Sequence, residues 1–287
     1  MSEIKQIQSI LEITPKLDAC CIDMFGVLWD GTQFFPNALN TLYHLKQAGK
    51  KIYILSNATE PQKQAEEKYA SFGLKVGIHY DAFLSSGTVL EMEVEKGFFE
   101  RFSGKKNYRF YMIGNKPHTL FQNIADHMTP DMNAADFVYF GSPSTKETAA
   151  LNIDHLMPEL EQALSLNKKA VIANPDYHAF KGPIKYCAQG TMGKWYEDRG
   201  GSVYWIGKPY PLIYQYALNF LQCPAHRVLM IGDTIRTDIA GGKNAGMKTL
   251  LITGTGITAS ALQQGLDLQT LCRMEEATPD YQIERFQ

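Results

Sequence analysis

The sequence predicts an α/β protein whose core is a doubly wound parallel sheet with a second α/β domain inserted into it. Three observations favour this fold. Short β-rich runs alternate with helical patterns along the 287 residues, as they do where crossover helices join parallel strands. Polar residues directly follow several of the β-rich runs. The segment 87–190 interrupts the pattern and contains strand candidates of its own.

The N-terminal section begins with a mixture of apolar and charged residues at 1–13, which predicts a short amphipathic helix. Farther along, Pro36 marks a helix start because proline fits the first helical turn, and Gly49 marks the end of that helix. The other predicted elements of this section are strands at 19–24 and 52–55 and a helix at 61–72 that Gly73 closes.

The middle section has strand candidates at 110–113, 137–140 and 170–173, separated by helical stretches. It is long enough to bury a small hydrophobic core of its own. We therefore predict a core domain made of 1–86 and 191–287, with an inserted domain at 87–190.

The C-terminal section repeats the strand and helix alternation more tightly. Pro211 begins a helix in which Ile213, Ala217 and Leu221 form one apolar face. The predicted strands are 202–206, 228–231 and 249–252, and a further helix runs from 233 to about 245. In such an open, Rossmann-like sheet, ligands bind beyond the carboxyl ends of the strands.

Composition excludes several classes of function. A formal net charge of −2 argues against a nucleic-acid or anionic-membrane partner, since both need a concentrated basic surface. No apolar run approaches the roughly 20 residues that span a bilayer. The five cysteines include no Cys-x-x-Cys pair, which favours a reduced, cytoplasmic protein.

Five polar residues follow predicted strands: Asp23, Ser56, Lys208, Asp233 and Asp238. An aspartate after a strand is by itself an ordinary turn or helix-cap residue. Together, however, these residues supply the parts of one reaction. Two carboxylates can hold a divalent cation, a lysine adds positive charge, and a hydroxyl can bind a phosphate oxygen. Attack by a carboxylate on a phosphate ester would then give an aspartyl-phosphate.

The sequences around these residues resemble the four motifs of the haloacid dehalogenase-like hydrolase superfamily. The run 23–28 is similar to its nucleophile motif, and 52–57 resembles the second motif, a hydrophobic strand that ends in a hydroxyl residue. The tripeptide 207–209 resembles the third motif, and 232–239 resembles the fourth. Their order, and the insertion between the second and third, are similar to subfamily IIA, which includes phosphatases for phosphosugars, 4-nitrophenyl phosphate and pyridoxal phosphate.

This resemblance implies that 87–190 is a cap that closes over a Mg²⁺ site and contributes to a homodimer. Asp23 would be the nucleophile and a metal ligand, together with Asp233 and the backbone carbonyl of Phe25. Asp238 would orient the groups that bind the metal directly without itself being a direct ligand. The substrate would be a small phosphorylated metabolite such as a sugar phosphate. The phosphate group of the substrate would be bound by Ser56, Asn57 and Lys208, of which Lys208 would also have a catalytic role. The rest of the substrate would be contacted by Asn174 and Asp176 of the cap.

One position departs from the family pattern. Phosphatases of the family carry a second aspartate two residues after the nucleophile, which protonates the leaving group and then activates water. Phe25 stands at that position and can do neither. Three explanations stay open: a substrate with a good leaving group, such as an acyl or aryl phosphate, a substitute acid from Asp30, Asp176 or His178, or a protein that binds a phosphorylated ligand with little or no turnover. Dehalogenation is disfavoured because that reaction has no use for the metal ligand Asp233.

Overall fold

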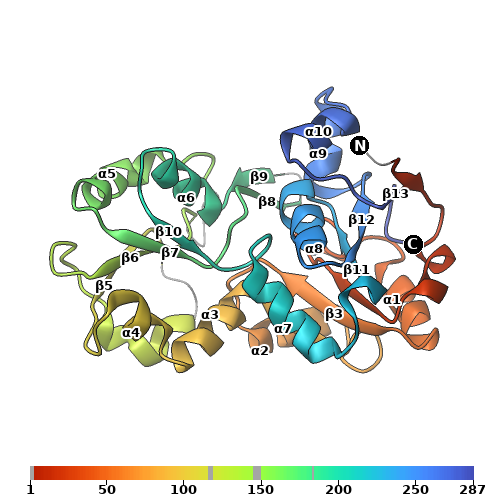
Figure 1. Cartoon of the computed structure of the whole chain (residues 1–287), viewed down its shortest axis with the longest axis horizontal. Coiled ribbons are helices and arrows are strands. Elements are labelled where there is room, and N and C mark those ends of the chain that lie inside the picture. Colours follow the sequence, from red (N-terminus) through yellow and green to blue (C-terminus); the bar gives the residue numbers. More distant parts are fainter. Residues whose placement is uncertain (1–2, 116–118, 145–149, 183) are drawn as a thin grey trace.

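The structure is a computed structural model that describes residues 3–115, 119–144, 150–182 and 184–287. Two lobes lie side by side (Figure 1). The core lobe contains a seven-stranded sheet. The second lobe, which we call the cap lobe after the predicted cap, contains a four-stranded sheet together with a two-stranded hairpin. The chain enters the cap lobe after the first four strands and returns to the core lobe for the last three. This arrangement confirms the predicted α/β class with a parallel sheet as its core.

The core sheet is parallel at every strand pair, in the order β1-β13-β12-β11-β2-β3-β4. Its central strands are buried on both faces, which explains their continuous apolar sequences. The strands are β1 (Lys5–Gln6), β2 (Ala19–Ile22), β3 (Lys51–Ser56), β4 (Ala82–Ser85), β11 (Val228–Gly232), β12 (Lys248–Ile252) and β13 (Tyr281–Ile283).

The direction of strand addition reverses at β2. The chain first builds outward through β3 and β4, and after the cap lobe it builds outward on the other side of β2 through β11 and β12. Carboxyl ends of strands at such a reversal form a crevice in which ligands bind. Asp23, Asp233 and Ser56 end or follow three neighbouring strands, so the topology brings them to this crevice.

Helices cover both faces of the core sheet. Cys20 of β2 belongs to a buried cluster with Leu42 of α1 (Ala38–Gln47), whereas its neighbour Cys21 belongs to a cluster with Tyr214 of α7 (Pro211–Leu221). This alternation follows from the two-residue period of a strand. The other helices are α2 (Gln62–Ala70), α3 (Ser86–Glu95), α4 (Phe98–Ser103), α5 (Met157–Ser165), α6 (Gln189–Glu197), α8 (Ala240–Asn244), α9 (Gly256–Gln263) and α10 (Leu268–Met274), with short helices η1 (Ile10–Glu12), η2 (Thr14–Lys16), η3 (Thr119–His127), η4 (Asp154–Leu156), η5 (Ala225–Arg227) and η6 (Ile235–Ile239).

The cap sheet is also parallel and has the order β10-β7-β6-β5. Helices α5 and α6 contribute buried residues to a cluster on one of its faces. The antiparallel β8–β9 hairpin is separate from this sheet. The strands of the cap lobe are β5 (Phe110–Ile113), β6 (Phe137–Phe140), β7 (Lys169–Ile172), β8 (His178–Lys181), β9 (Ile184–Cys187) and β10 (Val203–Trp205).

The predicted strand at 202–206 exists, but it joins the cap sheet. Val203 pairs with Ala170 of β7, and Trp205 pairs with Ile172. The segment 191–205 was assigned to the core domain by the sequence prediction. We therefore propose that the cap lobe ends near residue 206, where the chain crosses back to α7.

The N-terminal amphipathic helix is a wrong prediction. Residues 5–6 form the edge strand β1, which pairs with Tyr281 and Gln282, and the three-residue helix η1 follows at Ile10–Glu12. Pairing with a distant strand outweighs a helical pattern that is too short to be stable alone. In the described part of the chain, no helix combines the length and the apolar character needed to cross a bilayer.

Candidate active site

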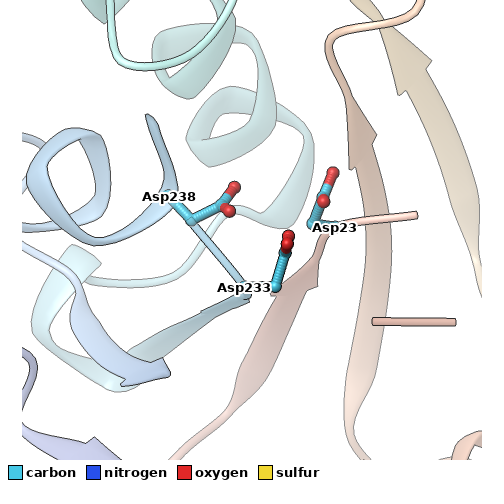
Figure 2. Close-up of side chains that lie close together, drawn as sticks. All are labelled: Asp23, Asp233 and Asp238. Carbon is cyan, nitrogen blue, oxygen red and sulfur yellow. The ribbon is translucent and has the colours of Figure 1, made fainter. Parts of the chain in front are cut away.

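Three carboxylates meet beyond the carboxyl ends of β2 and β11 (Figure 2). Asp23 follows β2, Asp233 follows β11, and Asp238 lies in η6. One oxygen of each side chain lies within 4.8 Å of the others, and all three residues are buried. Carboxylate oxygens in this arrangement are suited to a hard divalent cation such as Mg²⁺.

Asp233 is held by tight backbone packing. The Ile257 N–H donates to its Oδ2 atom at 2.5 Å. A Cβ atom at Gly26 or Gly256 would overlap this carboxylate, and both glycines have positive φ angles, 85° and 71°. Burial and the neighbouring Asp23 raise the pKa of the Asp233 carboxyl well above its ordinary value. The backbone therefore fixes a carboxylate whose charge needs a nearby cation.

Lys208 lies between two of the carboxylates. Its Nζ atom donates to Oδ1 of Asp23 at 2.6 Å and to Oδ1 of Asp238 at 2.7 Å, and its side chain is 2% exposed. Burial alone lowers the pKa of a lysine, but Asp23 and Asp238 together raise the pKa of Lys208 above its ordinary value. Burial raises the pKa of Asp23 to about 7, with Lys208 opposing the shift. The charge of Lys208 is thus fixed next to the proposed nucleophile.

Asn57 positions Lys208 through the lysine backbone. Its Oδ1 atom accepts from the Lys208 N–H at 2.7 Å, and its Nδ2 atom donates to the Lys208 carbonyl at 3.0 Å. Nδ2 also donates to Oδ1 of Asp176 at 2.9 Å. The oxygen and both amide hydrogens of the side chain are thus engaged with protein groups. These bonds indicate a positioning role for Asn57, and its contact with the phosphate group stays a prediction.

Ser56 ends β3, is 1% exposed, and borders the cavity described below. Its Oγ atom accepts from the N–H of Ala58 at 3.2 Å. This bond uses an acceptor site of the hydroxyl, and the O–H itself stays available as a donor to an anionic oxygen.

Phe25 follows Asp23, the proposed nucleophile, by two residues and borders the same cavity, where its ring packs against the core cluster. Asp30 also borders the cavity, but its Oδ1 atom accepts three hydrogen bonds, from the N–H and the hydroxyl of Thr32 and from the N–H of Gln33. Slight burial opposes this effect, yet these bonds hold the pKa of Asp30 below its ordinary value. Asp30 is therefore a charged turn residue and a poor acid.

The cap loop (173–177) places Asp176 over the site. The loop turn is fixed by the Asp176 N–H, which donates to Oδ1 of Asn174 at 2.9 Å. Burial raises the pKa of the Asp176 carboxyl. His178 follows the loop, and burial together with Lys185 lowers its pKa, which favours the neutral imidazole.

A cavity of about 770 Å³ lies beside the carboxylates and is lined by residues of both lobes. Asp238 lies behind Lys208, in contact with its ammonium group, and is not part of the lining. The other residues predicted for the site all border the cavity: Asp23, Phe25, Ser56, Asn57, Asn174, Asp176, Lys208 and Asp233. Arg236 and Tyr177 also line the cavity, although no sequence pattern indicated a role for either.

Two family models match complementary parts of the chain. The model described as haloacid dehalogenase-like hydrolase matches residues 20–130, and the model described as HAD-hydrolase-like matches residues 205–286. Between them they include Asp23, Ser56, Lys208 and Asp233, the residues gathered at the crevice. The chain belongs to the haloacid dehalogenase-like hydrolase superfamily.

Relatives of this hydrolase include several phosphatases. Ribonucleotide monophosphatase NagD of Escherichia coli is 28% identical over 246 residues, which cover 84% of this chain and 88% of that protein. Phosphoglycolate phosphatase 2 of Arabidopsis thaliana is 23% identical, with 85% of each chain covered. Such relatives are members of subfamily IIA, the branch that the motif order predicts.

Solved structures agree on the fold of this hydrolase. A haloacid dehalogenase-like hydrolase from Brucella suis superimposes with a TM-score of 0.82 at 22% identity, covering 98% of this chain and all of that one. A possible sugar phosphatase from Cytophaga hutchinsonii gives a TM-score of 0.76 at 22% identity, with 98% of each chain covered. The whole described architecture, including the cap lobe, is therefore shared with known structures.

Proposed function

We propose that this hydrolase is a Mg²⁺-dependent phosphatase that acts on a small phosphorylated metabolite through an aspartyl-phosphate on Asp23. The observation that carries the proposal is the Lys208 ammonium group, which touches both Asp23 and Asp238 at the base of the cavity. A buried cation beside a buried carboxylate lets that carboxylate approach an anionic phosphate.

The donor set supports a divalent cation. Three carboxylates and one ammonium group leave two negative charges in the cluster when all four groups are ionised, which is the charge that Mg²⁺ neutralises. Asp23, Asp233 and the backbone carbonyl of Phe25 would hold the ion, and Asp238 would support it through Lys208. When bound, Mg²⁺ neutralises phosphate charge and orients the phosphoryl group.

Attack by a carboxylate oxygen of Asp23 on phosphorus forms the aspartyl-phosphate and breaks the bond to the leaving-group oxygen. Water then attacks phosphorus, releases inorganic phosphate and restores Asp23. The Oδ1 atom of Asp23 is committed to Lys208, so we propose that Oδ2 makes the attack. Ser56 and Lys208 would bind the phosphoryl oxygens during both steps.

The leaving oxygen departs with a negative charge unless it receives a proton. Phe25 offers none, Asp30 is held in its charged form, and His178 favours its neutral form. Asp176 lines the cavity, and burial raises its pKa. We therefore propose Asp176 as the substitute acid, with Asn57 holding its Oδ1 atom in place.

A second candidate is a protein that binds a phosphorylated ligand but turns it over slowly. It is favoured by one observation, the aromatic ring of Phe25 at the position of the usual acid. A cytoplasmic location and a homodimer formed through the cap lobe remain predictions from the sequence.

The test is an assay of phosphate release with Mg²⁺ from nucleoside monophosphates, phosphoglycolate, sugar phosphates, pyridoxal phosphate, aryl phosphates and acyl phosphates. Asp23→Asn is the control, since it keeps the shape of the side chain and removes the nucleophilic charge. Metal-dependent release that this variant lacks supports the phosphatase. If no substrate is turned over and the protein still binds Mg²⁺ and phosphate, the binding protein is favoured.

A further inference from the structure

One arginine of the core lobe contacts the cap loop on both sides of Asp176. The Nη2 atom of Arg236 donates to the carbonyl of Pro175 at 2.6 Å. Its guanidinium carbon lies 3.8 Å from the centroid of the Tyr177 ring. A charge-assisted hydrogen bond and a cation–π contact are each worth more in a partly desolvated setting than on an open surface. Arg236 therefore contacts the residues before and after Asp176, whose side chain accepts a hydrogen bond from Asn57.

Arg236 also belongs to the segment that carries the acids of the metal site. It lies in η6, three residues after Asp233 and two before Asp238. The short helix is also held by α7, because the Tyr214 hydroxyl donates to the carbonyl of Thr237 at 2.8 Å. Arg236 thus connects the cap loop to the segment that carries Asp233 and Asp238.

The two lobes meet in few polar contacts near the cavity. Apart from Arg236, the described residues provide the Asn57–Asp176 bond and the bond from the Gly182 N–H in the hairpin turn to the Asp30 carbonyl at 3.0 Å. Within the cap lobe, the loop is anchored to the start of α6, where the Gly190 N–H donates to the Asp176 carbonyl at 3.0 Å. The loop consequently moves with the cap lobe unless the core lobe restrains it.

From these contacts we infer that Arg236 is a positioning residue that latches the cap loop over Asp23. It holds the backbone on both sides of Asp176 so that this carboxylate points at Asn57, which in turn fixes Lys208. The latch links cap closure to the phosphate-binding lysine through three side chains. Only the effect of the latch on turnover rests on the proposed phosphatase function, because the contacts themselves exist without substrate.

Hydrogen–deuterium exchange of the full-length protein without substrate tests the latch directly. The reporter is the peptide that spans 174–191, which includes the amide of Gly190. Arg236→Ala removes both contacts, and we expect exchange of this peptide to accelerate by roughly 10-fold or more. Tyr177→Leu removes only the ring contact and should give a smaller acceleration. Tyr177→Phe keeps the ring and should behave like the wild type.

Arg199→Ala is the matched control. Arg199 also stacks on a ring, with its guanidinium carbon 4.3 Å from the Trp195 ring centroid, and it also donates to a carbonyl, that of Trp195, at 3.3 Å. Both contacts stay within the cap lobe, so this variant should leave exchange of 174–191 unchanged. Equal acceleration by Arg199→Ala, or wild-type exchange in Arg236→Ala, would overturn the latch.

Turnover separates the latch from the proposed function. If the wild type hydrolyses aryl phosphates, Arg236→Ala should lower kcat/KM by roughly 10-fold or more, and Arg236→Lys should recover only part of it, because lysine keeps the charge but lacks the planar group. A wild type without turnover contradicts the phosphatase and leaves the exchange result as the test of the latch. Faster exchange with unchanged kcat/KM would show that the latch does not position the catalytic groups.

Discussion

The Nζ atom of Lys208 lies 2.6 Å from Oδ1 of Asp23, and the same nitrogen lies 2.7 Å from Oδ1 of Asp238. These contacts join residues from three distant parts of the chain in a buried site. Removing such a partner leaves a buried charge without compensation, which is strongly destabilising. The lysine therefore opposes the effect of burial on the pKa of Asp23 and compensates the buried carboxylates of the cluster.

Removal of metal should lower the stability of the protein. If Mg²⁺ binds the folded cluster and not the unfolded chain, as we propose, a concentration of 100 times its dissociation constant should stabilise the fold by about 2.7 kcal/mol. Thermal unfolding with Mg²⁺ and with EDTA measures this difference. In Asp233→Asn the metal-dependent rise in Tm should disappear. A rise of equal size in the variant would mean that Mg²⁺ binds elsewhere.

Phe25→Asp should increase turnover of substrates with poor leaving groups. The variant places a carboxyl group two residues after the nucleophile, where an acid can protonate the leaving oxygen. General acid assistance is typically worth at least about 10²-fold. We therefore expect kcat for an alkyl phosphate to rise by about 10²-fold. Aryl phosphates should change little, and Phe25→Asn serves as the control without an acid. A fall for alkyl phosphates in both variants would contradict this interpretation of Phe25.

Asp176→Asn should slow alkyl phosphate hydrolysis by about 10²-fold and affect aryl phosphates far less. Asparagine keeps an oxygen for the bond from Asn57 but cannot supply a proton. Asp30→Asn is the comparison, because Asp30 also lines the cavity but is engaged in a turn. Kinetics with a leaving-group series would show a steeper dependence on leaving-group acidity for Asp176→Asn. An equally steep dependence in Asp30→Asn would contradict the assignment of Asp176 as the acid.

Gly256→Ala should weaken Mg²⁺ binding by roughly 10-fold or more, because its methyl group would displace the carboxylate of Asp233. Gly104→Ala is a close control for backbone strain. Gly104 has a φ of 72°, against 71° for Gly256, and its Cβ would contact nothing within 4 Å. Titration of Mg²⁺ by calorimetry compares the two variants. Equal loss of affinity in both would assign the effect to strain rather than to Asp233.

Local sequence patterns predicted most of the fold. The predicted strands at 110–113 and 137–140 match β5 and β6 to the residue, because each is a short apolar run between turn residues. The place of β10 was not predictable, since a strand's own sequence does not identify its partner. Val203–Trp205 pairs with β7, over 30 residues earlier, and not with the core strand β11, which follows it in the sequence.

The candidate site shows the same limit. Asp23, Ser56 and Asp233 could be predicted because each ends or follows a core strand, and parallel strands bring their carboxyl ends to one edge. The partners of those residues were not predictable from spacing. Asn57 binds the backbone of Lys208, which is 151 residues away, and Arg236 meets Pro175 across the two lobes. Such contacts depend on how the cap lobe is placed, which no local pattern encodes.

The most direct test of the central claim is to trap the phosphorylated intermediate. The protein is mixed with Mg²⁺ and an aryl phosphate, quenched in acid within one turnover, digested and measured by mass spectrometry. We predict that the peptide containing Asp23 gains the mass of one phosphoryl group, and that Asp23→Asn shows neither this adduct nor phosphate release. Phosphate release that persists in Asp23→Asn, or a phosphoryl group found on a different peptide, would contradict the account.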